Sequence, residues 1–299
     1  MRIFCIINAR SGTAKKFSSS YVAQLFASHG LASKIVESKA GDSITSLTKD
    51  ATEEGFEVIV AGGGDGTVNA VASAIVGNTA IKLGVIPMGT FNHFARDLGI
   101  PNDVAKAVEI IAAGHFKSVD VGKVNDNIFV NNSSLGIYPA IVRLREGLQK
   151  SGHNKIWAAV WASIRIITRF RRLRLELHPA NEPVFKRNTV MLFVGNNTYE
   201  TSLAKLGTRL SLDRGRLWIT MPTMSTRWGL ISNLISILTA REKLDEVLTF
   251  ETTDLVVNTN HRLVKVAVDG EVLHLLPPLN YRSLPKSLQV IVPKPMETG

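Results

Sequence analysis

The chain has 299 residues, 45% of them hydrophobic and 20% charged, which is the composition of a folded globular protein long enough for two ordinary domains. Its net charge of +10 and pI of about 9.8 predict a surface that attracts polyanions such as nucleic acid, anionic lipid or nucleotide. The single cysteine, Cys5, excludes an internal disulfide framework and is typical of a reducing cytoplasm.

The first third of the chain alternates short apolar runs with helical patterns. The apolar runs predict strands over 3–8, 33–38, 57–62, 82–88 and 116–124. The first run is too short for the apolar core of a signal peptide and is expected to be a buried strand. Apolar residues at three- and four-residue spacing predict helices over 21–30, 43–55, 67–77 and 102–114. This order predicts a mostly parallel, Rossmann-like α/β sheet with helices on both faces.

The pattern changes near residue 123. Short β-rich runs follow over 127–134, 172–179, 184–196, 215–222, 254–260, 263–272 and 288–293, with helical segments over 138–172 and 225–248. They predict an antiparallel β-sandwich with helical insertions. We therefore expect one domain over 1–122 and a second over 123–286, with the closing stretch 287–299 able to return and complete the first.

The stretch AGGGDGTVNA, residues 61–70, places four glycines and one aspartate between a predicted strand and a predicted helix. Successive backbone N–H groups and a helix N-terminus together form a site for phosphate, and glycine lets the backbone approach a ligand closely. The loop has no lysine as in a P-loop, and positions 67 and 69 lack the third glycine of a dinucleotide fingerprint. It is a phosphate-binding loop of another kind.

Two further loops of small and polar residues support this interpretation. IPMGTFNHFARDLGIP, residues 86–101, follows the fourth predicted strand, and NARSG, residues 8–12, follows the first. Loops at the carboxyl ends of parallel strands share one edge of a sheet, where ligands bind. Taken singly, each loop could equally be an ordinary turn between a strand and a helix; together they indicate a site for nucleotide phosphates.

These loops carry a family resemblance. NARSG, GGGDGTVN and PMGTFNHFARDLGIP resemble the signatures of bacterial diacylglycerol kinase and related lipid kinases, which share a catalytic domain with sphingosine and ceramide kinases. FVNNSSLG (129–136) and AVDGEVL (267–273) extend the resemblance into the second half. It implies an ATP- and Mg²⁺-binding catalytic domain followed by a β-sandwich domain for the lipid substrate. The residues that we expect to contact the nucleotide are Asn8, Ser11, Gly12, Gly62, Gly63, Gly64, Asp65, Gly66, Thr67, Asn69, Gly89, Thr90 and Asn92.

Three carboxylates are candidates for the chemistry. Asp65 can hold Mg²⁺ beside the nucleotide, and the alternative is that it caps the helix over 67–76. Asp269 and Glu271 flank a glycine, so both could enter one crevice, where mutual repulsion could raise one pKa. The pattern alone favours a plain hairpin, because Asp-Gly is a strong turn signal. The resemblance assigns the proton acceptor to Glu271, with Asp269 in support.

The sequence departs from the resembling family at one metal position. That family usually carries Asp-Gly in the segment that corresponds to 210–220, where the aspartate helps to bind a structural Mg²⁺. Here Arg214 precedes Gly215, and Asp213 lies one place earlier. Either Asp213 serves as the ligand after a small shift, or the Arg214 guanidinium replaces the cation. The histidines show no metal-ligand spacing.

A basic and aromatic segment predicts contact with a membrane surface. In a helix, Arg165, Arg169 and Arg172 would share a stripe with Trp161, a combination suited to lipid headgroups. The alternative is a helix that packs its apolar face on the second domain and exposes its arginines. The longest apolar stretches are shorter than the roughly 20 residues of a bilayer span, so a cytoplasmic protein peripherally bound to the inner membrane face is expected. The sequence shows no nucleic-acid-binding module.

The predicted function is that of an ATP-dependent lipid kinase, which phosphorylates a hydroxyl of a diacylglycerol-like membrane lipid. One alternative is a soluble kinase with the same glycine loop, such as an NAD kinase, against which NARSG and the loop over 86–101 count. The other is a catalytically weak regulatory protein that binds nucleotide and membrane, which Arg214 favours.

Overall fold

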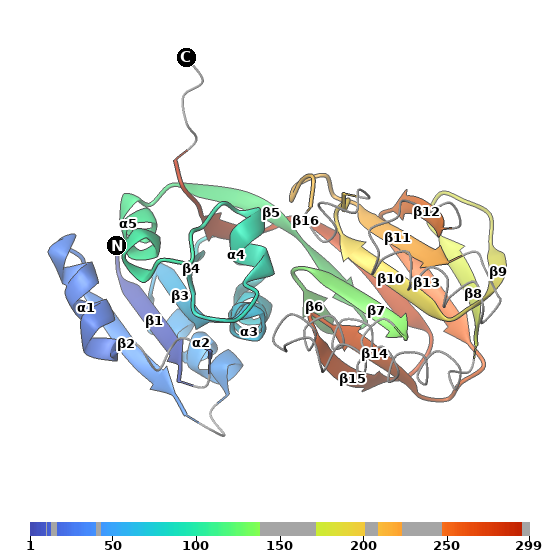
Figure 1. Ribbon diagram of the computed structural model, residues 1–299, viewed down its shortest axis with the longest axis horizontal. Coiled ribbons are helices and arrows are strands. Elements are labelled where there is room, and N and C mark those ends of the chain that lie inside the picture. The colour runs from blue at the N-terminus through green and yellow to red at the C-terminus, as the bar shows by residue number, and fades with distance from the viewer. Residues whose placement is uncertain are drawn as a thin grey trace, which may run out of the picture.

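The computed structural model describes residues 1–9, 11–12, 17–39, 43–137, 172–200, 209–222 and 247–294. It has an N-terminal α/β part and a C-terminal β part, side by side, with two long strands running from one into the other (Figure 1). The predicted helical segment over 138–172 lies outside the described residues, apart from its last position. Most of the segment predicted over 225–248 lies outside them as well.

The N-terminal part is built on four parallel strands in the order β2-β1-β3-β4. Their bounds are Ile3–Asn8 for β1, Ser33–Ser38 for β2, Val58–Gly63 for β3 and Lys82–Pro87 for β4. β3 is buried along its whole length, which explains why it reads as one apolar run. The predicted parallel sheet is confirmed, and its predicted strands are displaced by one residue at most.

In the described residues of this part, three helices connect these strands and two more follow β4. They are α1 (Ser19–Ser28), α2 (Ile44–Glu53), α3 (Asp65–Ile75), α4 (His93–Asp97) and α5 (Val104–Ala113). The side chains of Ser18, Ser43 and Asp103 accept hydrogen bonds from the first turns of α1, α2 and α5, which fixes where these helices begin. α3 begins two residues earlier than predicted. α3 and α4 lie on the side of this part that faces the β part (Figure 1).

The C-terminal part contains a six-stranded antiparallel sheet in the order β12-β11-β10-β7-β14-β15. Its strands are β7 (Asn132–Gly136), β10 (Met191–Asn196), β11 (Leu217–Pro222), β12 (Val247–Thr252), β14 (Val264–Val268) and β15 (Glu271–Leu275). β12 corrects the prediction of a helix as far as 248. Cross-strand pairing with β11 decides this stretch, because apolar spacing alone distinguishes poorly between helix and strand in short runs.

The remaining strands extend the first sheet into the C-terminal part. They are β5 (Phe116–Val124), β6 (Asn127–Phe129), β8 (Leu173–Pro179), β9 (Phe185–Thr189), β13 (Asp254–Thr259) and β16 (Leu279–Ile291). β16 pairs in parallel with β4 and antiparallel with β5 and β13. β5 and β16 are therefore continuous across the predicted boundaries at 122/123 and 286/287, which remain predictions.

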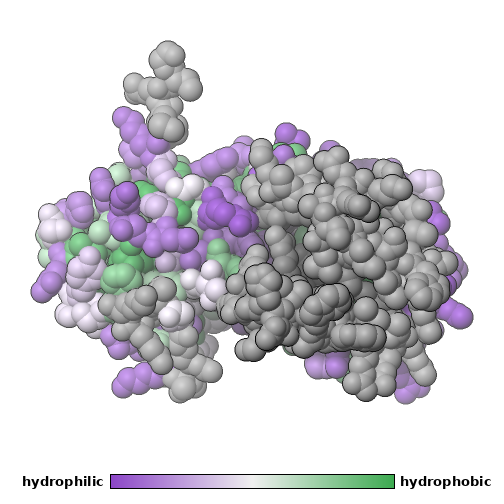
Figure 2. All heavy atoms as spheres, in the orientation of Figure 1, coloured by the Kyte–Doolittle hydropathy of each residue, from purple (hydrophilic) through white to green (hydrophobic). Residues whose placement is uncertain are grey.

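Two hydrophobic cores stabilise the fold. One lies among the parallel strands and their helices and includes Phe26, Ile59 and Phe94. The other fills the space between the six-stranded sheet and the antiparallel half of the first sheet, with Leu135, Leu177 and Tyr281 among its members, so this part is the predicted β-sandwich. Hydrophilic side chains are prominent on the described part of the face seen in Figure 2. No helix of the described residues is long and apolar enough to cross a membrane.

Candidate active site

The three predicted loops meet at one edge of the parallel sheet. They follow β1, β3 and β4, which are neighbours in the sheet order. Gly12 of the first loop lies beside Thr90 of the third, since a Cβ added to Gly12 would stand 3.4 Å from the Thr90 Oγ1. Asn8 donates from Nδ2 to the Thr67 Oγ1 at 3.0 Å, so the first loop is also bonded to α3. The edge is thus one connected surface.

Close packing between loops explains several of the glycines. A Cβ on Gly89 would lie 2.4 Å from the Gly64 Cα, and a Cβ on Gly63 would lie 2.3 Å from the Thr67 Oγ1. Neither position can accept a larger residue without moving backbone or a buried side chain. Gly66 is different, because an added Cβ would meet only the Glu271 Oε1, at 3.4 Å. Of the four glycines in this loop, Gly64 packs against another loop, Gly63 against its own helix and Gly62 against β1, whereas Gly66 lies beside a carboxylate.

Asp65 lies at the first turn of α3 and binds a neighbouring helix. Its two carboxylate oxygens accept hydrogen bonds from the backbone N–H groups of His93 and Phe94, each at 3.2 Å. These N–H groups begin α4, where a negative charge is stabilised. The α3 N-cap is Gly64, which makes no side-chain cap. The alternative prediction, that Asp65 caps its own helix, is therefore wrong.

Other predicted nucleotide-binding residues shape the loops. Asn92 adopts φ 51° at the start of α4, accepts from the Gly89 N–H at 2.9 Å and donates back to the Gly89 carbonyl at 3.2 Å. The Ser11 N–H donates to the Asn8 carbonyl at 2.9 Å and closes a turn. Thr90 is exposed. Asn92 and Ser11 therefore hold backbone N–H groups in position, and their own contact with a nucleotide remains a prediction.

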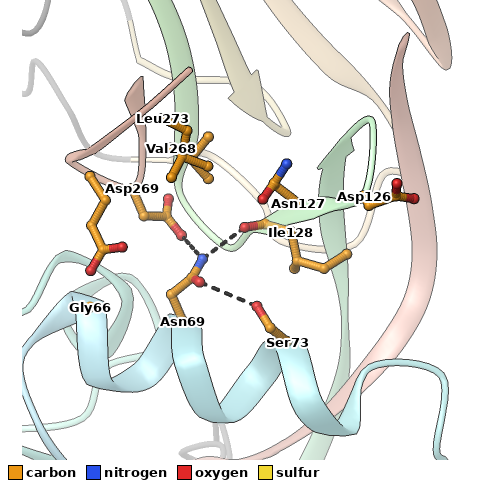
Figure 3. Close-up of a pocket in the computed structure, with 10 residues that line it drawn as sticks. Gly66, Asn69, Ser73, Asp126, Asn127, Ile128, Val268, Asp269 and Leu273 are labelled. Atoms are coloured by element: carbon orange, nitrogen blue, oxygen red, sulfur yellow. Dashed lines mark hydrogen bonds between the residues drawn. The ribbon is translucent and has the colours of Figure 1, made fainter. Parts of the chain in front are cut away.

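Asp269 lies in the tight turn between β14 and β15 and points its carboxylate inward. The carboxylate accepts four hydrogen bonds, from the Asn69 Nδ2 at 2.6 Å and from the backbone N–H groups of Val130, Asn131 and Asn132 at 2.7 to 2.9 Å. Figure 3 shows Asn69 on α3 bridging Asp269 and the Ile128 carbonyl. Asp269 therefore joins α3 to the β part.

Burial of the Asp269 carboxylate raises its pKa to about 6, against the lowering effect of its four N–H donors. Repulsion by Glu271 is not the cause, which corrects that part of the prediction. Asp269 and Gly270 both have positive φ, at 46° and 92°, as a two-residue hairpin turn requires. The hairpin prediction is confirmed, and Asp269 acts as a positioning residue within it.

Glu271 stands at the opening of a pocket between the two parts. The pocket has a volume of about 200 Å³, and its lining residues are Gly66, Asn69, Ser73, Asp126, Asn127, Ile128, Val268, Asp269, Glu271 and Leu273. α3 forms one wall, and β6 and the β14–β15 hairpin form the other (Figure 3). Glu271 is exposed and lies beside Gly66, the residue that follows Asp65. Glu271 therefore borders the pocket from the β part, opposite the first turn of α3, which contributes Gly66.

Asn131 and Arg209 belong to this site and were not predicted as functional residues. The Asn131 Nδ2 lies 3.5 Å from the Asp65 Oδ1, and its backbone N–H binds Asp269. The Arg209 guanidinium donates to the Asn131 Oδ1 at 3.1 Å and to the Val130 carbonyl. Its Nε pairs with Asp97 at 2.7 Å, and both side chains are buried, at 0% and 2% exposure. The motif FVNNSSLG contains Asn131, but Arg209 lies in no motif.

Asp213, the predicted structural metal ligand, already has a cationic partner. Its carboxylate pairs with the Lys117 Nζ at 2.8 Å and accepts from the Ser211 hydroxyl at 2.6 Å. The hydrogen bond from Lys117 is the main cause that lowers the Asp213 pKa. The backbone N–H of Arg214 donates to the Asn197 Oδ1. Lys117, rather than the Arg214 guanidinium, is therefore the cation that contacts Asp213. Among the described residues no group of three or more His, Cys, Asp or Glu could hold a metal.

The family comparison covers the N-terminal part. Residues 2–124 match the family model of the diacylglycerol kinase catalytic domain. Diacylglycerol kinases of Staphylococcus carnosus strain TM300 and Staphylococcus aureus strain JH9 are each 46% identical over 99 residues, which is 33% of this chain and 32% and 31% of those proteins. The matched stretch thus spans about a third of the length of these curated relatives.

Two solved structures share the fold along the whole chain. A diacylglycerol kinase from Bacillus anthracis str. Sterne aligns with a TM-score of 0.69 and 20% identity, over 98% of this chain and 97% of that one. An NAD kinase from Archaeoglobus fulgidus in complex with ATP aligns with a TM-score of 0.51 and 11% identity, over 97% and 93%. The two-domain fold of this chain is therefore the one that these two structures share. Within it, residues 2–124 are similar to a diacylglycerol kinase catalytic domain.

Proposed function

We propose that the protein is an ATP-dependent lipid kinase that phosphorylates a hydroxyl of a diacylglycerol-like lipid at the inner face of the cytoplasmic membrane. The observation that carries this proposal is the position of Glu271. It reaches from the β14–β15 hairpin to Gly66, which follows Asp65 in the glycine-rich loop. Phosphoryl transfer needs a phosphate cradle and a base for the attacking hydroxyl. The matched catalytic domain supports the same reaction class.

The loops after β1, β3 and β4 would hold the ATP phosphates. Their backbone N–H groups and the N-terminus of α3 favour negative charge at this edge. Packing between Gly64 and Gly89 and the bonds of Asn92 hold these groups in place before the nucleotide binds. Such preorganisation stabilises the charge of the transition state, because little rearrangement is then needed.

The acceptor hydroxyl would enter from the pocket and attack the γ-phosphorus. As the new P–O bond forms, the bond from the γ-phosphorus to the bridging oxygen breaks and ADP leaves. Glu271 takes the hydroxyl proton. Asp269 lies two residues away in the hairpin turn and, through Asn69 and the backbone of 130–132, fixes that turn against α3.

Mg²⁺ would be held at Asp65. The donor set fits, because Mg²⁺ commonly binds one or two carboxylates together with substrate phosphates and water. Bound there, the ion would neutralise charge on the transferring phosphates. Asp65 itself is oriented by the N–H groups of His93 and Phe94, and its Oδ1 lies 3.5 Å from the Asn131 Nδ2 of the β part.

The first test is transfer of γ-labelled phosphate from ATP and Mg²⁺ into diacylglycerol presented in anionic mixed micelles, followed by chromatography. Labelled lipid supports the proposal. A parallel reaction contains NAD as the acceptor, and labelled NAD with unlabelled lipid would make the protein a soluble kinase, as the fold shared with an NAD kinase allows. Nucleotide binding without any transfer would indicate a regulatory protein.

The Glu271→Gln variant tests the base. We expect the turnover number to fall by about 100-fold or more, since general base catalysis contributes roughly 10²–10⁴-fold, while the affinity for ATP stays unchanged. Glu109→Gln is the matched control, because Glu109 is an exposed glutamate on α5. Unchanged turnover in Glu271→Gln would remove Glu271 as the base.

A further inference from the structure

The β14–β15 hairpin ends the six-stranded sheet. Among the described strands, β15 pairs only with β14, so its outer edge carries no further strand. The two strands pair from Val264 with Leu275 to Val268 with Glu271. The hairpin carries both Asp269 and Glu271, so a surface on it lies close to the proposed active site.

The two faces of the hairpin differ in character. Val264, Val266 and Val268, with Leu273 and Leu275, belong to or pack against the second core. The opposite face carries the pairs Lys265 with His274 and Ala267 with Val272, because directly paired residues point to the same side of a sheet. One face is therefore fixed in the protein, and the other combines apolar and basic side chains.

Apolar side chains on this second face are open to solvent. Val272 is 39% exposed, and Leu263 and Leu276, one residue beyond the Val264–Leu275 pair, are 53% and 67% exposed. Continuing the ladder by one step places Leu263 opposite Leu276, on the same face as Lys265 and His274. We call the set Leu263, Lys265, Val272, His274 and Leu276 the hairpin patch.

The charges of the hairpin patch indicate which surface it fits. Lys265 and His274 are exposed between the apolar residues, and Arg262 is exposed next to Leu263. The whole chain carries a net charge of +10. Exposed leucines beside basic residues suit the boundary between anionic headgroups and acyl chains, where both kinds of side chain are stabilised.

We propose that the hairpin patch is the surface by which the protein docks on an anionic membrane. This rests on the proposed function in one respect, namely that the membrane holds the lipid substrate. Since successive strand residues point to opposite faces, Val272 faces the membrane while Glu271 faces α3 and Gly66. Docking would thus place Glu271, the proposed base, directly next to a residue that contacts the lipid surface.

The experiment measures sedimentation of the full chain with vesicles of phosphatidylcholine alone and of phosphatidylcholine with 40% phosphatidylglycerol. The test variants are Leu263→Gln/Leu276→Gln and Lys265→Gln. Their controls are Val184→Gln, at a valine 54% exposed outside the hairpin patch, and Lys49→Gln, at an exposed lysine on α2. Because all the changed side chains are exposed, the variants should fold, and thermal melts check this.

We expect the wild-type protein to bind the anionic vesicles more strongly than the neutral ones. Affinity for anionic vesicles should fall about tenfold in the leucine variant and about fivefold in Lys265→Gln, with the controls unchanged. Equal binding by the leucine variant and the wild type would overturn the proposal. So would a dimer in solution that the leucine variant loses while vesicle binding stays the same, because the patch would then be covered by a second copy.

Turnover separates this proposal from the proposed function. Dioctanoylglycerol, dissolved as monomers, should be phosphorylated equally by the leucine variant and the wild type, whereas transfer to long-chain diacylglycerol in vesicles should fall with vesicle binding. If no lipid is phosphorylated by the wild type, the kinase proposal fails while the sedimentation result still decides the docking proposal. Loss of turnover on both substrates by a folded leucine variant would count against docking.

Discussion

The buried pair between Arg209 and Asp97 offers a strong test of what holds the candidate site together. Arg209 belongs to the β part, and its side chain pairs with Asp97 at the end of α4. The same guanidinium donates hydrogen bonds to the Val130 carbonyl and the Asn131 Oδ1. The perturbation is Arg209→Met, which keeps much of the volume of the side chain and removes its charge. Asp97 then keeps only the longer contact of its Oδ1 with the Arg96 Nε, at 3.7 Å.

The magnitude follows from burial. Both side chains are essentially inaccessible, at 0% and 2% exposure, and removing one partner of a buried ion pair costs about 3–5 kcal/mol. We therefore expect Arg209→Met to lower the free energy of unfolding by about 4 kcal/mol. The double variant Arg209→Met/Asp97→Leu should lose less, about 1–2 kcal/mol, since no buried charge remains and only the carbonyl of Val130 and the amide of Asn131 lack a donor.

The assay is urea unfolding followed by tryptophan fluorescence and circular dichroism, with the denaturant slope compared between variants. Arg282→Met is the matched control. The Arg282 Nε likewise binds a carboxylate oxygen, that of Asp254, at 2.6 Å, but the two side chains are 68% and 40% exposed. An exposed pair of this kind contributes about 0–1 kcal/mol, so this control should stay close to the wild type.

Two results would refute the reasoning. A loss of less than about 1 kcal/mol in Arg209→Met would mean that the Asp97 carboxylate finds water or another donor. A double variant less stable than Arg209→Met would mean that the pair stabilises through its hydrogen bonds rather than through charge compensation.

The remaining predictions concern Asp269 and the loop glycines. Asp269→Asn should lower the free energy of unfolding in urea by about 2–3 kcal/mol, because an amide NH₂ would face backbone donors. An unchanged free energy of unfolding would contradict the contacts described. The folded protein holds the Asp269 proton more tightly than the unfolded chain does (pKa about 6 against 3.8). The stability of the wild type relative to this variant should therefore fall by about 2 kcal/mol as pH rises from 4 to 6, and a rise would refute the assignment. Gly89→Ala should lower the free energy of unfolding by about 1–3 kcal/mol and weaken ATP binding measured by calorimetry. Gly12→Ala, whose added Cβ would meet only ordinary van der Waals contacts, should change the stability little.

Local patterns predicted the α/β part closely. β1, β2 and β5 have the predicted bounds. For β1 the reason is that a strand buried in a parallel sheet is a continuous apolar run. The three loops were predicted at one edge because parallel topology puts every strand-to-helix loop of this kind there. The prediction was less successful at β12, where pairing with β11 overrides the spacing of a short apolar run.

The roles of individual side chains depended on contacts that no local pattern contains. Asn69 was expected at the nucleotide, but its Nδ2 binds Asp269, 200 positions away in the chain. Asp65 was expected to bind a metal or cap α3, and its carboxylate binds the first turn of α4.

The sequence by itself determined the order of strands and helices, the glycine loops and the pair of carboxylates around Gly270, because turn chemistry and hydrophobic periodicity operate over a few residues. Only the tertiary structure decided that Asp269 faces backbone donors while Glu271 faces Gly66, and that Arg209 reaches Asp97 across 112 positions. Such pairings depend on strand register and on how two cores pack, so their physical cause lies in the whole fold.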